Sequence, residues 1–206
     1  MGIADTSIAA AAALFSGVAG AAAWRTALAA NRTADSVAQI ERDRWHTEMT
    51  PHIKLAVTTE RGWPELLVHF DGPAPLGTIG SLELSIRDDR DRSGDPALAG
   101  SATAEERAAT IWGPFRLRPH IDNADALGRR AEPFSLDHGE EHRFALDHSL
   151  PPRWYEGAEG TQRWQREFHN KPLRVWVRCV VEGHKPWRLT ADLPVNGLRP
   201  VWSRAH

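Results

Sequence analysis

Cysteine is almost absent from this sequence, whose 206 residues include only Cys179. A single thiol cannot form a disulfide within the chain, and a chain of this length buries enough surface to fold without disulfides or a structural metal. Because most secreted domains of this size carry disulfides, the lone cysteine favours a reducing compartment.

The sequence also lacks an excess of positive charge. Its 25 lysine and arginine residues face 27 aspartate and glutamate residues, which gives a formal net charge of -2. No basic stripe runs along the chain, and the only lysines are Lys54, Lys171 and Lys185. Nucleic-acid binding needs concentrated lysine and arginine for phosphate contacts, so we expect no nucleic-acid partner.

Motifs for nucleophilic catalysis, phosphate binding and dinucleotide binding are missing. The sequence contains no Gly-x-Ser-x-Gly, no Walker A loop and no glycine-rich dinucleotide pattern. Cys179 alternates with valines on the apolar side of a predicted strand, where a thiol is inert. The sequence therefore favours a binding module over an enzyme and indicates no cofactor.

One run without charged residues begins at Ile8 and ends at Trp24. Asp5, Thr6 and Ser7 precede this run and are good N-cap residues, so we predict a helix. Its 17 residues span about 25 Å, slightly less than a hydrocarbon core of about 30 Å. We interpret the helix as a membrane anchor. An alanine-rich soluble helix and a cleaved signal peptide are the alternatives.

Positive charges follow this apolar run and do not precede it. Residues 1–7 contain no lysine or arginine, whereas Arg25, Arg32, Arg42 and Arg44 come after the run. This distribution predicts a single-pass protein of the inner (cytoplasmic) membrane with its C-terminal domain in the cytoplasm. Secretion after signal cleavage is the alternative.

Helical character continues after the apolar run until Pro51 ends it. The sequence from residue 25 onward is mostly polar, which is typical of a solvated helical stalk. We therefore divide the chain into an anchor helix and stalk over residues 1–50 and a second domain over residues 51–206.

The second domain shows the alternation of apolar and polar residues that predicts β-strands. The clearest strand covers residues 173–182, and a turn at Gly183 joins it to another at residues 187–195. Further predicted strands cover residues 53–59, 65–70, 82–87 and 143–147. Short helices are expected at residues 107–111, after a capping box that begins at Thr103, and at residues 161–168. Strands without alternating helices predict a mainly β domain, an antiparallel immunoglobulin-like β-sandwich.

The stretch between Asp137 and His148 concentrates residues that can bind a metal. Its candidate ligands are His138, His142 and His148, beside several carboxylates. The i, i+4 spacing of His138 and His142 brings ligands together only on a helix, and Gly139 indicates a turn instead. A hydrophilic turn between strands is the simpler interpretation. A metal-dependent hydrolase using this stretch is the alternative function.

Alternating charges follow a predicted strand at residues 87–92, which is typical of a solvated loop. Adjacent carboxylates such as Asp88 and Asp89 bind Mg²⁺ in some proteins, but neighbouring strand residues point to opposite faces. We therefore interpret residues 87–92 as a loop without a metal.

Tryptophan is abundant, with nine residues against one tyrosine. We expect most of these side chains to be structural. Trp176 and Trp187 are placed on the polar side of the last predicted hairpin, where they cap the sandwich or form a patch that binds a protein partner.

Several short segments resemble those of a family of uncharacterised actinobacterial proteins with an alanine-rich N-terminal helix and a soluble domain. These segments are WHTEMTP at 45–51, IRDD at 86–89, TAE at 103–105, IWGP at 111–114, PPRW at 151–154, LRV at 173–175 and PWRL at 186–189. The resemblance implies the same architecture and supplies no activity or site residues. From the sequence, we expect a membrane-anchored interaction or ligand-binding module.

Overall fold

The computed structural model describes residues 3–92, 102–155, 157–195 and 203–206. For residues 3–23, 26, 203 and 204 it describes the backbone alone. The chain divides into two compact units, Met1–Glu48 and Met49–His206.

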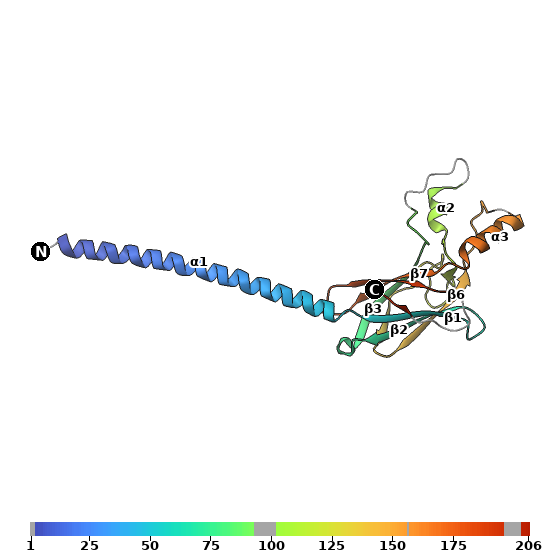
Figure 1. Ribbon diagram of the computed structural model, residues 1–206, viewed down its shortest axis with the longest axis horizontal. Coiled ribbons are helices and arrows are strands. Elements are labelled where there is room, and N and C mark those ends of the chain that lie inside the picture. Colours follow the sequence, from blue (N-terminus) through green and yellow to red (C-terminus); the bar gives the residue numbers. More distant parts are fainter. Residues whose placement is uncertain (1–2, 93–101, 156, 196–202) are drawn as a thin grey trace. The chain divides into compact units, whose positions relative to one another are not determined.

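The first unit is one continuous helix, α1 (Ile3–Glu48), drawn from blue to cyan in Figure 1. Alanine has the highest helix propensity of all residues, and the polar half contains good helix formers, so no position before Glu48 interrupts the helix. Pro51 follows shortly after its end, as predicted.

In the part of the chain that the structure describes, no helix has both the length and the apolar character that crossing a membrane requires. The anchor predicted from Ile8 to Trp24 receives no support from this finding. Most of its side chains lie outside the described part, so the anchor stays a prediction.

The second unit consists mainly of two antiparallel sheets, which confirms the prediction of a mainly β domain. One sheet has the order β4-β6-β2-β1-β9, and the other has the order β5-β3-β7-β8. The strands of the first sheet are β1 (His52–Thr58), β2 (Glu65–Gly72), β4 (Phe115–Leu117), β6 (Glu141–His148) and β9 (Ser203–Arg204). The strands of the second sheet are β3 (Thr78–Arg87), β5 (Phe134–Asp137), β7 (Leu173–Val180) and β8 (Trp187–Leu193). A 3₁₀ turn, η1 (Ala74–Leu76), joins β2 to β3.

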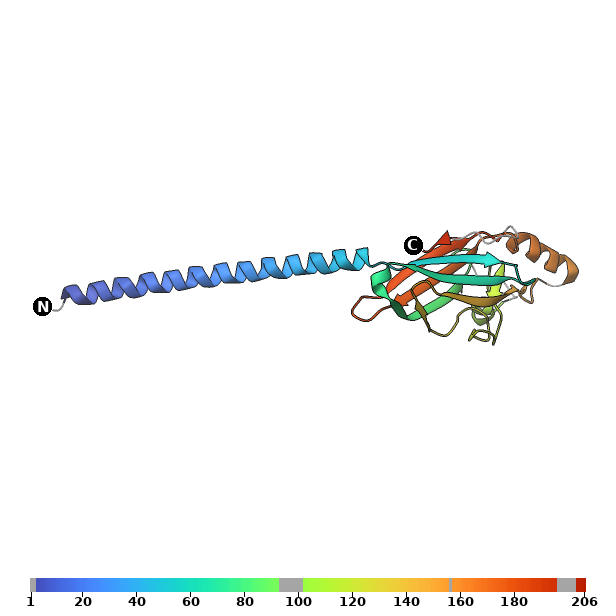
Figure 2. The same cartoon turned by 90° about the horizontal axis from the view of Figure 1, so that it is seen from below.

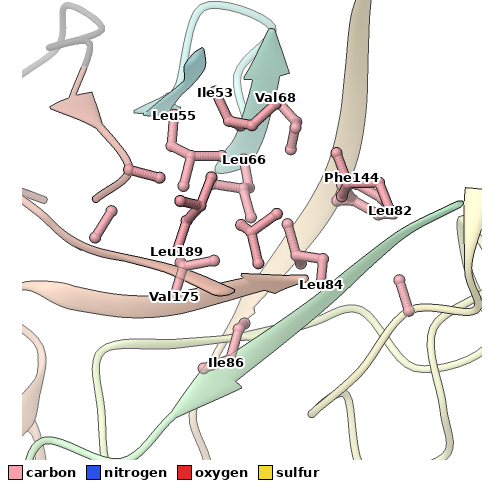
Figure 3. Close-up of a cluster of buried hydrophobic side chains, with 14 of the residues drawn as sticks. Ile53, Leu55, Leu66, Val68, Leu82, Leu84, Ile86, Phe144, Val175 and Leu189 are labelled. Atoms are coloured by element: carbon pink, nitrogen blue, oxygen red, sulfur yellow. The ribbon is translucent and has the colours of Figure 1, made fainter. Parts of the chain in front are cut away.

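The core lies between the two sheets, as expected for a sandwich. Figure 3 shows Ile53, Leu55 and Leu66 of the first sheet facing Leu84 and Val175 of the second. These side chains are at most 1% exposed. Burial of such apolar area, worth about 25 cal/mol per Å², is the main force that holds the sheets together.

Strand β7 shows the alternation that the sequence predicted. Leu173, Val175, Val177 and Cys179 are buried, whereas Trp176 between them is exposed. Burial raises the pKa of the Cys179 thiol to about 12, so this thiol stays protonated and unreactive at neutral pH. The predicted position of Cys179 on the apolar face is therefore confirmed.

The C-terminal residues connect one edge of each sheet. Ala205 N–H donates a 2.9 Å hydrogen bond to the Ile53 carbonyl on β1. His206 and Thr190 on β8 exchange backbone hydrogen bonds of 2.9 and 2.6 Å. Figure 2 shows the C-terminus beside the strands of the sandwich. The chain end thus covers one open edge, a device that limits edge-to-edge association of strands.

Two short helices lie toward the end of the sandwich where β3 finishes and β7 begins (Figure 1). Helix α2 (Ala104–Ala109) starts with the predicted capping box, in which Thr103 Oγ1 accepts from the Glu106 N–H at 3.1 Å and Glu106 accepts from the Thr103 N–H at 2.9 Å. Helix α3 (Gly157–Phe168) contains the predicted helical segment and buries Trp164 and Phe168. Both helices are placed to shape this end of the domain.

Candidate functional site

The three histidines predicted as metal ligands do not converge. His138 lies in the turn between β5 and β6, where its ring meets Phe70 edge-on with centroids 5.7 Å apart. His142 and His148 lie six residues apart on β6, which corresponds to about 20 Å. Over the described ranges, no group of three or more His, Cys, Asp or Glu residues is arranged to hold a metal ion. The described residues therefore give the hydrolase alternative no support, and it stays a prediction.

The two tryptophans predicted as a partner patch lie on different faces of the last hairpin. Trp176 is 44% exposed on the outer face of β7, as expected. Trp187 is only 6% exposed and pairs with the buried Cys179, so its predicted position on the polar face is wrong. Position 187 has the same parity as Leu189, and side chains two residues apart on a strand share a face. Trp187 is therefore a core residue.

An aromatic cluster that the sequence did not predict as a unit joins α3 to the sandwich. Trp112 lies at its centre, with ring centroids 5.3 Å from Trp164, 5.7 Å from Phe168 and 6.3 Å from Trp154. The Trp164 side chain is fully buried, and its indole N–H donates to the carbonyl and hydroxyl of Ser149 at 3.3 Å. This cluster fixes Trp112 beside the loop that follows β3.

Asp89 of that loop accepts hydrogen bonds from two cations. Arg92 donates to it at 2.7 and 3.0 Å, and Lys171 donates at 2.8 Å. Burial alone would raise the pKa of Asp89, but the hydrogen bonds from Lys171 and Arg92 outweigh burial and lower the pKa. Arg92 also lies 4.1 Å from the centroid of the Trp112 ring. The prediction of a simple solvated loop is therefore wrong for Asp89, whose side chain is 10% exposed.

Asp88 has a separate set of partners. It forms a 3.1 Å ion pair with Arg129 and accepts from the Trp112 backbone N–H at 3.1 Å. Arg129 also donates to the Thr110 carbonyl at 2.8 Å. The adjacent carboxylates of Asp88 and Asp89 therefore bind different cations. Their contacts hold the loop after β3 against the segment that follows α2.

These contacts frame a pocket of about 710 Å³ at this end of the sandwich, which we call the arginine pocket. Its lining contains six arginines, two aspartates and two tryptophans. The arginines are Arg87, Arg90, Arg92, Arg107, Arg129 and Arg174, and the other named members are Asp88, Asp91, Trp112 and Trp176. Arginine therefore dominates the charge of the lining, although the whole chain has a formal net charge of -2.

Four of these arginines are already oriented by local partners, three by carboxylates and one by an aromatic ring. Arg174 forms a 2.9 Å ion pair with Asp192, and Arg129 and Arg92 are held by Asp88 and Asp89. The Arg87 guanidinium lies 3.8 Å from the centroid of the Trp176 ring. Stacking and pairing restrict side-chain motion, so less conformational entropy is lost when such guanidinium groups bind a ligand.

Two histidines stack where β6 and α3 end. The rings of His148 and His169 are 4.3 Å apart with an interplanar angle of 13°, and His148 also stacks on Phe115. Burial, and secondarily the neighbouring His148, lowers the pKa of His169. Protonation of His169 is therefore less favourable in the folded protein than in the unfolded chain.

We expect the free energy of unfolding to decrease as the pH falls through about 6.5, because the unfolded chain then binds a proton at His169 more readily than the folded protein does. Urea unfolding at about pH 7.5 and about pH 5.5, on either side of that value, measures the difference. The difference in the free energy of unfolding between the two pH values should be smaller in His169→Gln than in the wild type. It should be unchanged in the control, His138→Gln. Equal pH dependence in all three proteins would contradict the expectation.

Comparisons with protein-family models, with curated proteins and with solved structures find no match to this chain. The resemblance to actinobacterial proteins thus stays a prediction.

Proposed function

We propose that the β-sandwich is a binding module that takes an anionic ligand into the arginine pocket. The observation that carries this proposal is the gathering of six arginines with Trp112 and Trp176 around one pocket of about 710 Å³. That volume lies within the range of about 300–1,000 Å³ typical of ligand sites.

The chemistry of the lining supports an anion over a neutral or cationic ligand. A guanidinium group offers five N–H donors in a planar fork that matches carboxylate and phosphate oxygens. Asp88 and Asp91 in the lining, with Asp89 and Asp192 beside it, balance only part of the positive charge, since these four carboxylates face six arginines. The two indoles add apolar surface beside these donors. The arrangement therefore favours a carboxylate- or phosphate-bearing ligand that also has an apolar part.

We also infer that the sandwich is immunoglobulin-like. The order β6-β2-β1 in one sheet and β3-β7-β8 in the other matches strands E-B-A and C-F-G of that fold. Domains of this kind carry their variable loops at the two ends of the sandwich, which supports a binding role for an end pocket by analogy of fold alone.

Titration calorimetry of the full chain with inorganic pyrophosphate and with citrate tests the anion site. We expect binding that weakens with added salt, because ions screen partly exposed charges. The double variant Arg87→Gln/Arg90→Gln should weaken binding at least about tenfold, since hydrogen bonds to charged groups are worth about 1.5–3 kcal/mol. The control is Lys54→Gln, which removes one charge from β1 of the other sheet. Equal binding in the double variant and the control would contradict the proposal.

We further propose that α1 attaches this module to the cytoplasmic membrane, with the sandwich in the cytoplasm. Support comes from the uncharged run from Ile8 to Trp24 and from Arg25 and Arg32, which follow it. Fusions of alkaline phosphatase and of a fluorescent protein that matures only in the cytoplasm, each placed after His206, test the orientation. We expect fluorescence in the membrane fraction. Phosphatase activity without fluorescence would contradict the proposed orientation. Fluorescence that high salt releases from the membrane fraction would contradict a membrane-spanning α1.

A further inference from the structure

The outer face of β7 extends the arginine pocket across the second sheet. Arg174, Trp176 and Arg178 alternate with buried residues along β7, so their side chains share the outer face. Arg174 and Trp176 also line the arginine pocket, whereas Arg178 lies on the same face two residues after Trp176. The pocket and this face are therefore continuous.

Neighbouring strands add a cation at each end of this row. Arg87 on β3 pairs in register with Arg174, and Arg188 on β8 pairs in register with Arg178. Arg87, Arg174, Trp176, Arg178 and Arg188 together are called the β7 track below. The register thus gives each end of the β7 track two arginines, and the indole between them is 44% exposed, with the Arg87 guanidinium 3.8 Å from its centroid.

Two carboxylates neutralise part of the positive charge of the β7 track. Asp192 pairs with Arg174, and Glu83 pairs with Arg178. Among the residues that the structure describes, no carboxylate lies within ion-pair distance of Arg87 or Arg188. Each end of the β7 track therefore keeps one arginine without a carboxylate partner.

We propose that the β7 track, together with the arginine pocket, binds an extended acidic peptide segment of a partner protein. The segment has two acidic residues four positions apart and an apolar residue midway between them. This inference rests on the proposed anion-binding function of the arginine pocket and names the kind of ligand that the pocket takes.

The spacing of the side chains supports an extended peptide. Side chains at i and i+2 of a strand lie about 6.6–6.8 Å apart on one face. Arg174 and Arg178 are four residues apart, so about 13 Å separates their positions. An extended peptide repeats at the same interval and therefore places acidic side chains over both ends when its central apolar side chain covers Trp176.

Charge distinguishes this occupant from a small anion and from a nucleic acid. A small anion would be held within the arginine pocket and would leave Arg178 and Arg188 unused. Closely spaced phosphates of a single strand would add negative charge over the middle of the β7 track, where Ser85 and Thr190 in register with Trp176 carry no charge. A peptide places one acidic group at each end, where two arginines outnumber the single carboxylate.

Fluorescence anisotropy of labelled peptides with the full chain tests the inference. The first peptide has the core Glu-Ser-Leu-Ser-Glu, and the second has the same residues in the order Glu-Glu-Leu-Ser-Ser. Both have the same net charge, but adjacent glutamates of an extended chain point to opposite faces, so only the first peptide can place two carboxylates on the β7 track.

We expect the first peptide to bind at least about tenfold more tightly than the second, and Trp176→Ala to weaken it about tenfold, as for a central aromatic contact. Arg188→Gln should weaken it about two- to fivefold, as for an exposed charge pair. Lys54→Gln on the other sheet serves as the control and should leave binding unchanged.

Equal binding of the two peptides, with pyrophosphate still bound in the arginine pocket, would overturn this inference and leave the anion site intact. Failure of both peptides and of pyrophosphate would overturn the inference and the proposed function together. Tighter binding of an oligothymidylate than of the first peptide would overturn the inference in favour of a nucleic acid.

Discussion

Replacement of Trp164 by alanine should lower the free energy of unfolding of the sandwich by about 3–5 kcal/mol, as for other large-to-small core substitutions of tryptophan. The Trp164 side chain is fully buried and contacts Trp112, Tyr155 and Phe168. Its removal leaves a cavity under α3 and deprives the buried Ser149 of an N–H donor. Urea unfolding of the full chain, followed by the fluorescence of the remaining tryptophans, measures the loss.

Trp164→Phe is the matched control for this substitution. Phenylalanine keeps most of the apolar contact with Trp112 and Phe168 but cannot donate to Ser149. We expect a loss of about 1–3 kcal/mol, which is the cost of leaving a buried acceptor without its partner. A loss below about 1 kcal/mol for Trp164→Ala would show that this side chain does not fix α3 to the sandwich.

Replacement of Gly128 by alanine should lower the free energy of unfolding by more than about 3 kcal/mol, because two separate penalties coincide. Gly128 has a φ of +74°, and a left-handed conformation costs residues other than glycine about 1–2 kcal/mol. An added Cβ would also lie 2.1 Å from the Leu117 carbonyl oxygen. Because the Leu117 N–H donates to the Gly128 carbonyl at 2.8 Å, the clash cannot be relieved without loss of that contact.

Gly62→Ala isolates the conformational part of this penalty. Gly62 also has a positive φ, +87°, but an added Cβ would meet nothing within 4 Å. We expect Gly62→Ala to lower the free energy of unfolding by only about 1–2 kcal/mol. Arg129 follows Gly128 directly, so Gly128→Ala should also disturb the Asp88 ion pair and weaken anion binding. Equal losses for the two glycine variants would contradict the close approach to Leu117.

The strands could be predicted from the sequence because the alternation of apolar and polar residues is visible within each strand segment. The alternation in β7 and β8 reports directly which side chains face the core, and burial in the structure follows it. The same rule, applied to position 187, gives Trp187 the buried face of Leu189, and our placement of Trp187 on the polar side was wrong because it did not follow this parity. Strand β9 has only two residues, which is too short for any alternation to be visible.

The arginine pocket could not be predicted, because its contacts join distant parts of the chain. Asp89 binds Lys171, which lies 82 residues away, and Asp88 binds Arg129, which lies 41 residues away. The charged segment at residues 87–92 was the only local indication, and the same composition is typical of a solvated loop. The histidines show the opposite case, since their closeness in sequence did not bring His142 and His148 together on β6.

Nuclear magnetic resonance of the indole N–H groups shows directly whether anions bind in the arginine pocket. The nine tryptophans are distributed over the chain, and replacement of each by phenylalanine assigns its signal in the ¹⁵N-labelled protein. On addition of pyrophosphate, we predict shifts at Trp112 and Trp176, which line the arginine pocket, and none at Trp63, whose indole donates to Glu65 in the other sheet. Shifts at Trp63 with none at Trp112 or Trp176 would contradict the account.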